Sequence, residues 1–314
     1  MDMKRILRDT ALALALVAPL EGWLNVEWAR LLAPRHHEYT ADLARATPGK
    51  RVAFFGDSHP HSAFLNTPVP DSVANVSFGS ESLRDIHVKL LTLLRRGVRL
   101  HTVVLQADPH VFSPYRETTN NEQVVVLGAD VADYNAVYGR SLSGVKQLGM
   151  RVYPLSDVLN RNLLVSLLTA KYTRSAAAAQ TESTPWHRLS AEARGRVADG
   201  RLLDQFGTGP FALSAVMYEQ WKAILALCRQ HGIRVVAIRY PVADEYLARL
   251  PRYDLRAVDE LLRATPPDTI LDYTTLYAGQ TAPFTDSDHL GAAGSAAFGP
   301  RVFADLHNLP ARRR

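Results

Sequence analysis

Residue types that together activate a serine occur at two widely separated places in this sequence. Ser58 lies in the tetrapeptide Gly-Asp-Ser-His at 56–59, directly after the apolar run at 52–55. Asp286 and His289 lie three residues apart near the other end of the chain. A histidine within hydrogen-bond reach takes the proton of a serine, and a carboxylate holds the tautomer of that histidine. The pattern predicts Ser58 as nucleophile, His289 as base and Asp286 as the residue that orients the base.

These residues need a scaffold that brings distant segments to one edge, and the sequence indicates one. We expect buried strands at 51–55, within 73–78, and at 101–107, 233–238 and 269–271. We expect helices at 83–96, about 212–230 and 291–307. Apolar strands that alternate with helices are typical of a parallel sheet covered on both faces, which is an α/β fold. Ligands of such sheets bind at the carboxyl ends of the strands, where Ser58 is expected.

A third element is the tripeptide Phe-Gly-Ser at 78–80, between the second strand and the next helix. The backbone N–H of Gly79 can face an oxyanion that develops during acyl transfer. A plain turn glycine remains the alternative. In the same way, Asp286 could simply cap the helix that follows it.

The order of these elements resembles the SGNH/GDSL hydrolase superfamily, over about 51–110 and 230–308. The shared pattern is Gly-Asp-Ser after the first strand, a glycine after the second, and Asp-x-x-His before the last helix. The resemblance implies a flavodoxin-like three-layer α/β sandwich with a parallel sheet of about five strands. It gives the triad the roles stated above and assigns the amides of Ser58 and Gly79 to an oxyanion hole.

One motif departs from the family pattern. Members usually carry Gly-x-Asn-Asp after the third strand, and the Asn donates to the oxyanion. Here that place reads Leu-Gln-Ala-Asp-Pro-His at 105–110, without an Asn. We place His110, as a substitute donor, and Asp57 beside the oxyanion or substrate. Loss of one donor typically lowers the rate by about 10²–10³-fold, which slows an enzyme without abolishing it.

The resemblance is strongest to envelope proteins that add acetyl groups to bacterial exopolysaccharides or remove them. It implies hydrolysis or transfer of an acyl ester, expected to be acetyl, on an envelope glycan through a Ser58 acyl-enzyme, without a cofactor. The alternative is a non-catalytic component of a polysaccharide machine that binds carbohydrate or assists assembly. A divalent-metal site is a weaker alternative, with Asp57, His59 and His61 or with the cluster at 286–289 as ligands.

Residues 1–34 predict an uncleaved signal anchor in the inner membrane, with an amphipathic helix or a cleaved signal peptide as the alternatives. Lys4, Arg5 and Arg8 precede a short apolar run at 11–18, which is typical of export signals. We therefore expect an extracytoplasmic, periplasmic protein that can meet other polysaccharide-machinery proteins.

The remainder, 35–314, reads as one α/β domain with an insertion at about 111–210. We expect a polar loop at 111–130 and a mobile, exposed segment at 173–200. Cys228 lies in an apolar helical pattern that predicts burial. The net charge of +5 is scattered over 314 residues, so no nucleic-acid partner is expected.

Overall fold

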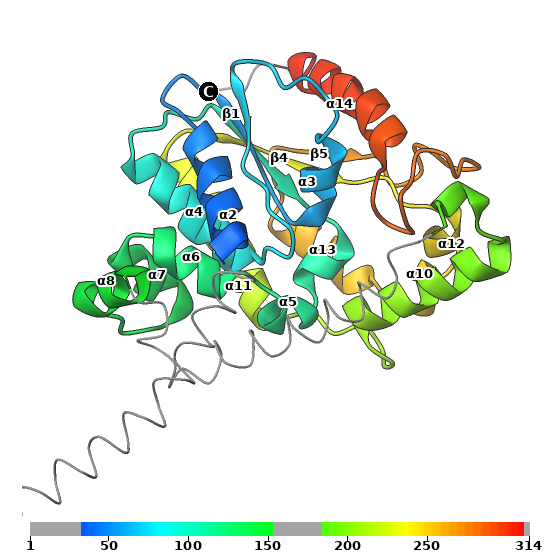
Figure 1. Ribbon diagram of the computed structural model, residues 1–314, viewed down its shortest axis with the longest axis horizontal. Coiled ribbons are helices and arrows are strands. Elements are labelled where there is room, and N and C mark those ends of the chain that lie inside the picture. The colour runs from blue at the N-terminus through cyan, green and yellow to red at the C-terminus, as the bar shows by residue number, and fades with distance from the viewer. Residues whose placement is uncertain (1–32, 153–183, 311–314) are drawn as a thin grey trace, which may run out of the picture.

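The computed structural model describes residues 33–152 and 184–310 as an α/β fold around one sheet (Figure 1). The strands are β1 (Val52–Phe55), β2 (Val73–Asn75), β3 (Thr102–Gln106), β4 (Arg234–Arg239) and β5 (Thr269–Asp272). The helices are α2 (Ala33–Arg45), α3 (Ser58–Ala63), α4 (Leu83–Arg95), α5 (Tyr115–Thr118), α6 (Glu122–Gly128), α7 (Val131–Tyr138), α8 (Gly144–Val152), α10 (Ala191–Phe206), α11 (Ala215–Gln230), α12 (Asp244–Leu247), α13 (Arg256–Ala264) and α14 (Ala292–His307). Short 3₁₀ helices are η1 (Pro109–Phe112), η3 (Trp186–Arg188) and η4 (Leu250–Arg252).

All five strands are parallel and lie in the order β2-β1-β3-β4-β5. The chain moves outward from β1 to β2 and then returns past β1 to β3, so the direction of winding reverses between β1 and β3. Phe55 pairs with Leu105 in this central register, so the segments after both strands emerge side by side. Ligands of open parallel sheets bind at such a reversal. The expected α/β class, the flavodoxin-like order and the five strands are confirmed.

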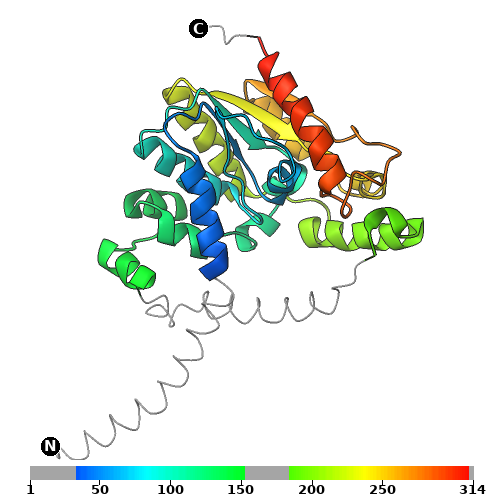
Figure 2. The same ribbon diagram turned by 45° about the horizontal axis from the view of Figure 1, so that its top comes forward.

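Alternate residues of the strands fill two separate cores. Phe55, Val103 and Leu105 face one core, which α2, α4, α11 and α13 cover. Phe54 and Val104 face the other, which α3 and α14 cover. Figure 2 shows α14 and α2 on opposite sides of the sheet. Burial of both faces explains why the strands read as continuous apolar runs rather than as an alternation.

The described residues between β3 and β4, which are 107–152 and 184–233, contain more helix than the sequence predicted. The expectation of a polar loop at 111–130 is wrong, because η1, α5 and α6 lie there and α6 buries its residues 124–127. The expectation of an exposed segment at 173–200 is also wrong from residue 191 onward. Helix α10 begins there and packs Ala198 and Leu202 against Val242 and Tyr246 near α12. Residues 173–183 lie outside the described part.

The predicted signal anchor at 1–34 lies almost wholly outside the described residues, which begin at Ala33 in α2. Within the described ranges, none of the helices has the length and apolar character needed to span a bilayer. Cys228 is buried on α11, as predicted.

Candidate functional site

The structure brings Ser58, His289 and Asp286 into one hydrogen-bonded row, here named the surface triad. The Nε2 atom of His289 lies 2.7 Å from Oγ of Ser58, although the two residues are 231 positions apart in sequence. Both carboxylate oxygens of Asp286 lie 2.9 Å from Nδ1 of His289. Ser58 and His289 are half-buried, and the Asp286 side chain is 41% exposed. These distances are those that transfer of the serine proton to the histidine requires.

Ser58 takes its position from the sharp turn between β1 and α3. A Cβ atom on Gly56 would lie 2.5 Å from Cγ of Pro60 and 2.7 Å from Oε1 of Gln106, so only glycine fits there. Asp57 then caps α3 by accepting a hydrogen bond from the backbone N–H of His59 at 3.0 Å. The serine is consequently the first residue of a short helix at the carboxyl end of the sheet.

His289 is held by a tight loop before α14. The isolated antiparallel bridge between Phe284 and Leu290 closes the loop. Oδ1 of Asp286 accepts the backbone N–H groups of Asp288 and His289 at 3.0 and 2.9 Å, which is a local side-chain turn. Asp286 therefore holds both the backbone and the ring of His289. The alternative that Asp286 caps the following helix is wrong, because Gly291 occupies that position.

Gly79 lies in the half-buried turn after β2, and hydrogen bonds to the turn and to the start of the next helix hold it in place. Its carbonyl oxygen accepts a hydrogen bond from Nδ2 of Asn121 at 2.8 Å. Ser80, the next residue, has φ of 68°, a left-handed conformation that is uncommon for a serine and that clusters at functional sites. Ser82 and Asp85 then form a reciprocal capping box at the start of α4. The role of the Gly79 amide in an oxyanion hole stays a prediction.

Two residues that the sequence placed beside the oxyanion or substrate are buried. His110 and Asp57 are both 0% exposed. The Nε2 atom of His110 lies 2.7 Å from Oδ2 of Asp57, and Arg116 pairs with the same oxygen. Both side chains are buried and bonded to each other, and their assignment to the oxyanion or substrate stays a prediction. Gln106 is also occupied, because its Oε1 accepts from the N–H of Asp57 at 2.7 Å.

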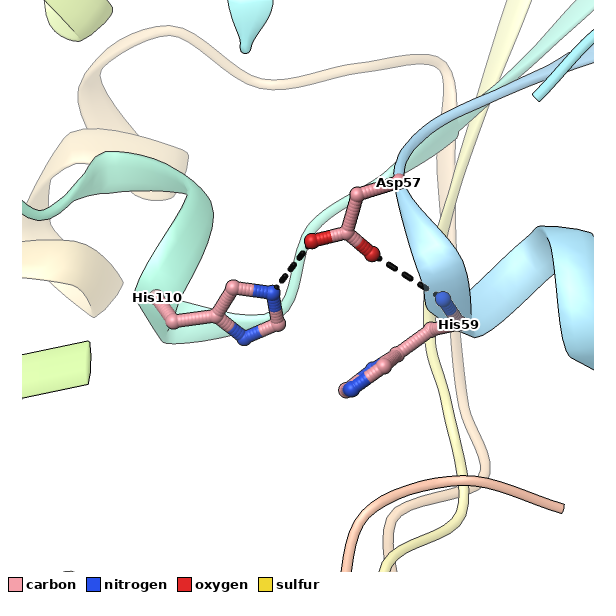
Figure 3. Close-up of side chains that lie close together, drawn as sticks. All are labelled: Asp57, His59 and His110. Carbon is pink, nitrogen blue, oxygen red and sulfur yellow. Dashed lines mark hydrogen bonds and ion pairs between the residues drawn. The ribbon is translucent and has the colours of Figure 1, made fainter. Parts of the chain in front are cut away.

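His59 lies at the centre of a second group of charged side chains beneath the surface triad. Its Nδ1 lies 2.7 Å from Oδ2 of Asp108, and its Nε2 lies 3.2 Å from Oδ2 of Asp288. Asp288 Oδ2 also accepts from Nε of Arg201 at 2.7 Å. Figure 3 shows how the Asp57 carboxylate bridges the ring of His110 and the backbone of His59. We name as the buried network Asp57, His59, Asp108, Arg116, Asp288 and Arg201.

The surroundings keep Asp57 and Asp288 ionised. Burial by itself raises the pKa of Asp57, but Arg116, His110 and His59 together outweigh burial and hold that pKa well below its usual range. Burial likewise raises the pKa of Asp288, whereas His289, His59 and Arg201 together hold it well below its usual range.

The two buried histidines differ in charge. Burial lowers the pKa of His59, but the facing carboxylates of Asp108 and Asp288 outweigh burial and raise the pKa to about 10. For His110, burial prevails and the pKa is lowered. At neutral pH, His59 is therefore an imidazolium and His110 a neutral ring that donates its Nε2 proton to Asp57.

The same side chains include the potential ligands of a metal. Ligand atoms lie within 4.8 Å of one another in two sets, which are Asp57, His59 and His110, and His59, Asp288 and His289. The ring nitrogens of His59 each face a separate carboxylate oxygen rather than a shared centre, and arginines already supply positive charge. This arrangement fits a network of ion pairs better than a ligand shell. His61, part of the sequence-based alternative, lies instead with Nδ1 3.3 Å from the carbonyl of Ser77.

Asp288 and three residues of the insertion contribute in ways that the sequence interpretation missed. Asp288 also approaches the base, because its Oδ1 lies 3.4 Å from Nδ1 of His289. Arg116 supports Asp57, while Arg201 and Gln205, one turn apart on α10, both reach Asp288. The only signal for α10 was the spacing of Ala198, Leu202 and Gln205, which marks one buried helical stripe.

A small cavity of about 130 Å³ lies beside His59. Asp108, Tyr240 and Tyr246 line it together with His59, whereas Ser58 and His289 do not. Ser58 itself is half-buried, so part of its surface is accessible to solvent.

A search of protein-family models and of curated proteins found no match to this sequence.

Proposed function

We propose that this protein is a serine-dependent acyl-ester hydrolase or acyltransferase whose reaction passes through a Ser58 acyl-enzyme. The observation that carries the proposal is the continuous row from Ser58 Oγ through His289 to the Asp286 carboxylate, with distances of 2.7 and 2.9 Å. Chains of nucleophile, base and orienting carboxylate recur on unrelated folds and are recognised by this geometry.

In the proposed reaction, Oγ of Ser58 attacks the ester carbonyl carbon while Nε2 of His289 takes the hydroxyl proton. The tetrahedral intermediate collapses as His289 returns that proton to the departing alcohol, which leaves the acyl group on Ser58. Water or a sugar hydroxyl then attacks the acyl carbon while His289 takes its proton. The bond from that carbon to Ser58 Oγ breaks, Oγ regains the proton from His289, and the acid or the new sugar ester leaves. The backbone amide of Ser58, at the first turn of α3, and that of Gly79 are the proposed oxyanion donors.

Its proposed substrate is an acetylated or acetyl-accepting glycan of the bacterial envelope. This part rests on the resemblance of the motif order to envelope members of the SGNH superfamily and on the export-like pattern of Lys4, Arg5 and Arg8 before the apolar run. Association with the inner membrane through residues 1–34 and with polysaccharide-machinery proteins belongs to the same proposal.

The test is release of acetate from a small acetyl ester by the full chain, beside the variants Ser58→Ala and His289→Ala. We expect each variant to lower kcat by about 10⁴–10⁶-fold with unchanged folding. Ser62→Ala, on the same helix α3, is the matched control and should keep full turnover.

Labelling of Ser58 by a fluorophosphonate separates the two functions. An active parent that is labelled at Ser58 supports the acyl-enzyme. A folded parent that neither turns over nor is labelled would contradict it and would favour the non-catalytic role in carbohydrate binding or assembly. Gln106 and His110 support that alternative. Their side chains already form hydrogen bonds within the protein, so neither supplies the third oxyanion donor.

A further inference from the structure

We propose that His59 is a permanently protonated positioning residue, which fastens the strand end that carries Ser58 to the loop that carries His289. The part that concerns His289 rests on the proposed function, whereas the charge state of His59 does not. The argument starts from hydrogen-bond chemistry, because both ring nitrogens of His59 face carboxylate oxygens.

Both carboxyl oxygens of Asp108 accept hydrogen bonds from neighbouring N–H groups. Its Oδ2 accepts from Nε2 of Gln106 at 2.7 Å, and its Oδ1 accepts from the backbone N–H of Tyr240 at 2.9 Å. An amide N–H has no lone pair to offer, so both oxygens of Asp108 act as acceptors, as the oxygens of an ionised carboxylate do. In the proposed state the Nδ1 atom of His59, 2.7 Å from Oδ2, carries the proton of this contact.

Asp288 imposes the same condition on the other nitrogen. Its Oδ2 accepts from Nε of Arg201 at 2.7 Å and from Nε2 of Gln205 at 3.0 Å. The Nε2 atom of His59 approaches this oxygen to 3.2 Å. A neutral imidazole has a single N–H, so it cannot donate to two carboxylates at once. His59 must be an imidazolium.

Charge balance gives a second reason. The buried network holds three carboxylates, Asp57, Asp108 and Asp288, and two arginines, Arg116 and Arg201. A neutral His59 would leave one net negative charge in a group whose three carboxylate side chains are at most 7% exposed, and unpaired buried charge is costly. With His59 protonated, three negative charges meet three positive ones. The raised pKa of His59, about 10, agrees with this count.

Other titratable rings near His59 do not replace it as the cation. The ring centroid of His110 lies 4.8 Å from that of His59, and burial lowers its pKa. The Tyr240 ring lies 6.3 Å away, and burial raises its pKa well above the usual value, so it stays neutral. The ring of His289 lies 5.2 Å away and belongs to the surface triad.

His59 and Asp288 affect the surface triad because each is adjacent in sequence to one of its members. Ser58 precedes His59 in α3, and His289 follows Asp288 in its loop. One charged ring therefore joins the nucleophile's helix, the end of β3 and the loop of the base. Asp288 is held so that its Oδ1 lies 3.4 Å from Nδ1 of His289, beside the contact made by Asp286.

The protonation state is tested by NMR of ring nitrogens and their protons in the full chain. We expect His59 to retain both N-bound protons from pH 5 to 8, with no titration near 6.5, the ordinary value for histidine. A single N-bound proton at pH 7, or a midpoint near 6.5, would overturn the proposal. Neither outcome depends on turnover. The NMR experiment therefore tests the charge of His59 even if the protein proves to be catalytically inactive.

The positioning role is tested with His59→Gln, which keeps hydrogen-bonding atoms but removes the charge. His61→Gln, on the same helix α3, is the matched control. We expect His59→Gln to shift the ring resonances of His289 and to lower kcat by about 10²-fold with little change in KM, because small misplacements of reacting groups cost rates of this order. Unchanged His289 resonances in folded His59→Gln would contradict the positioning role even if the parent proved inactive.

Asp108→Asn combined with His59→Gln distinguishes charge pairing from packing. If the two charges act as a pair, the double variant should be hardly worse than His59→Gln alone in thermal midpoint. Additive losses would show that the two side chains act independently and would count against the fastening role.

Discussion

The surface triad and the buried network both consist of carboxylates and imidazoles, but they differ in how far their carboxylates are exposed to solvent. In the surface triad, the Asp286 side chain is 41% exposed, whereas Asp288, two residues later in the buried network, is 1% exposed. An exposed carboxylate can be hydrated and needs few partners. A buried one must be fully paired, and Asp288 has His59, Arg201 and Gln205. The difference suggests that the exposed group is arranged for reaction and the buried group for rigidity.

The strongest test of this contrast removes a buried cation. Arg116→Met leaves Asp57 without its ion-pair partner in a site that water does not reach. Loss of one member of a buried pair typically costs about 3–5 kcal/mol, so we expect a decrease of that size in the free energy of unfolding, measured in urea. Arg256→Met breaks an exposed pair with Asp254 and should change little. Equal decreases in the two variants would show that the buried ion pair stabilises the fold no more than the exposed one does.

The pH dependence of stability tests the charge of His59 separately. The folded state, with a pKa of about 10, binds a proton that the unfolded state releases near 6.5. This contribution is complete below pH 6.5 and is lost as the pH rises toward 10, by at most about 1.4 kcal/mol per pH unit.

The measurement is the difference in unfolding free energy between the parent and His59→Gln across pH 6–10. We expect this difference to shrink with rising pH. Burial also raises the pKa of Glu81, to about 8, despite its contact with Lys89, but this group is common to both proteins and cancels. A constant difference over the whole range would indicate that His59 contributes by packing and not by charge.

A smaller effect, on kcat, is expected from a substitution of Asp286, the exposed carboxylate of the surface triad. Asp286→Asn retains an oxygen that can accept the backbone N–H groups of Asp288 and His289, so the loop should persist. We expect kcat to fall by about 10–10²-fold, less than complete loss of an orienting carboxylate can cost, because Asp288 also faces the ring. Asp254→Asn, at an exposed position away from the site, is the control. A loss as large as that of Ser58→Ala would show that Asp286 alone orients the base.

Sequence reasoning recovered the sheet because each strand carries a local signal. The runs at 52–55, 102–106 and 234–239 are apolar and β-branched or aromatic, and the turn at Gly56 interrupts the first of them. The surface triad was also recoverable, since Asp-x-x-His is a local pattern and the topology brings it to the same edge as Ser58.

The buried network was not recoverable for the opposite reason. Arg116 lies in the segment interpreted as a polar loop, and Arg201 lies directly after the segment interpreted as exposed chain. Their partners, Asp57 and Asp288, are 59 and 87 positions away. A single arginine that pairs over such a distance adds nothing to helical or strand periodicity. The contact of His110 with Asp57 could not be predicted for a similar reason, because the two residues are 53 positions apart in the sequence.

The separation of 231 positions between Ser58 and His289 has a consequence for biosynthesis. A chain emerging from the ribosome exposes Ser58 long before His289, so growing intermediates have no complete surface triad. Asp57 can meet Arg116 after 59 further residues, whereas His59 can meet Asp288 only after 229. The contacts of His59 with Asp288 and of Ser58 with His289 therefore form only after all five strands have been translated, because β5 ends at Asp272.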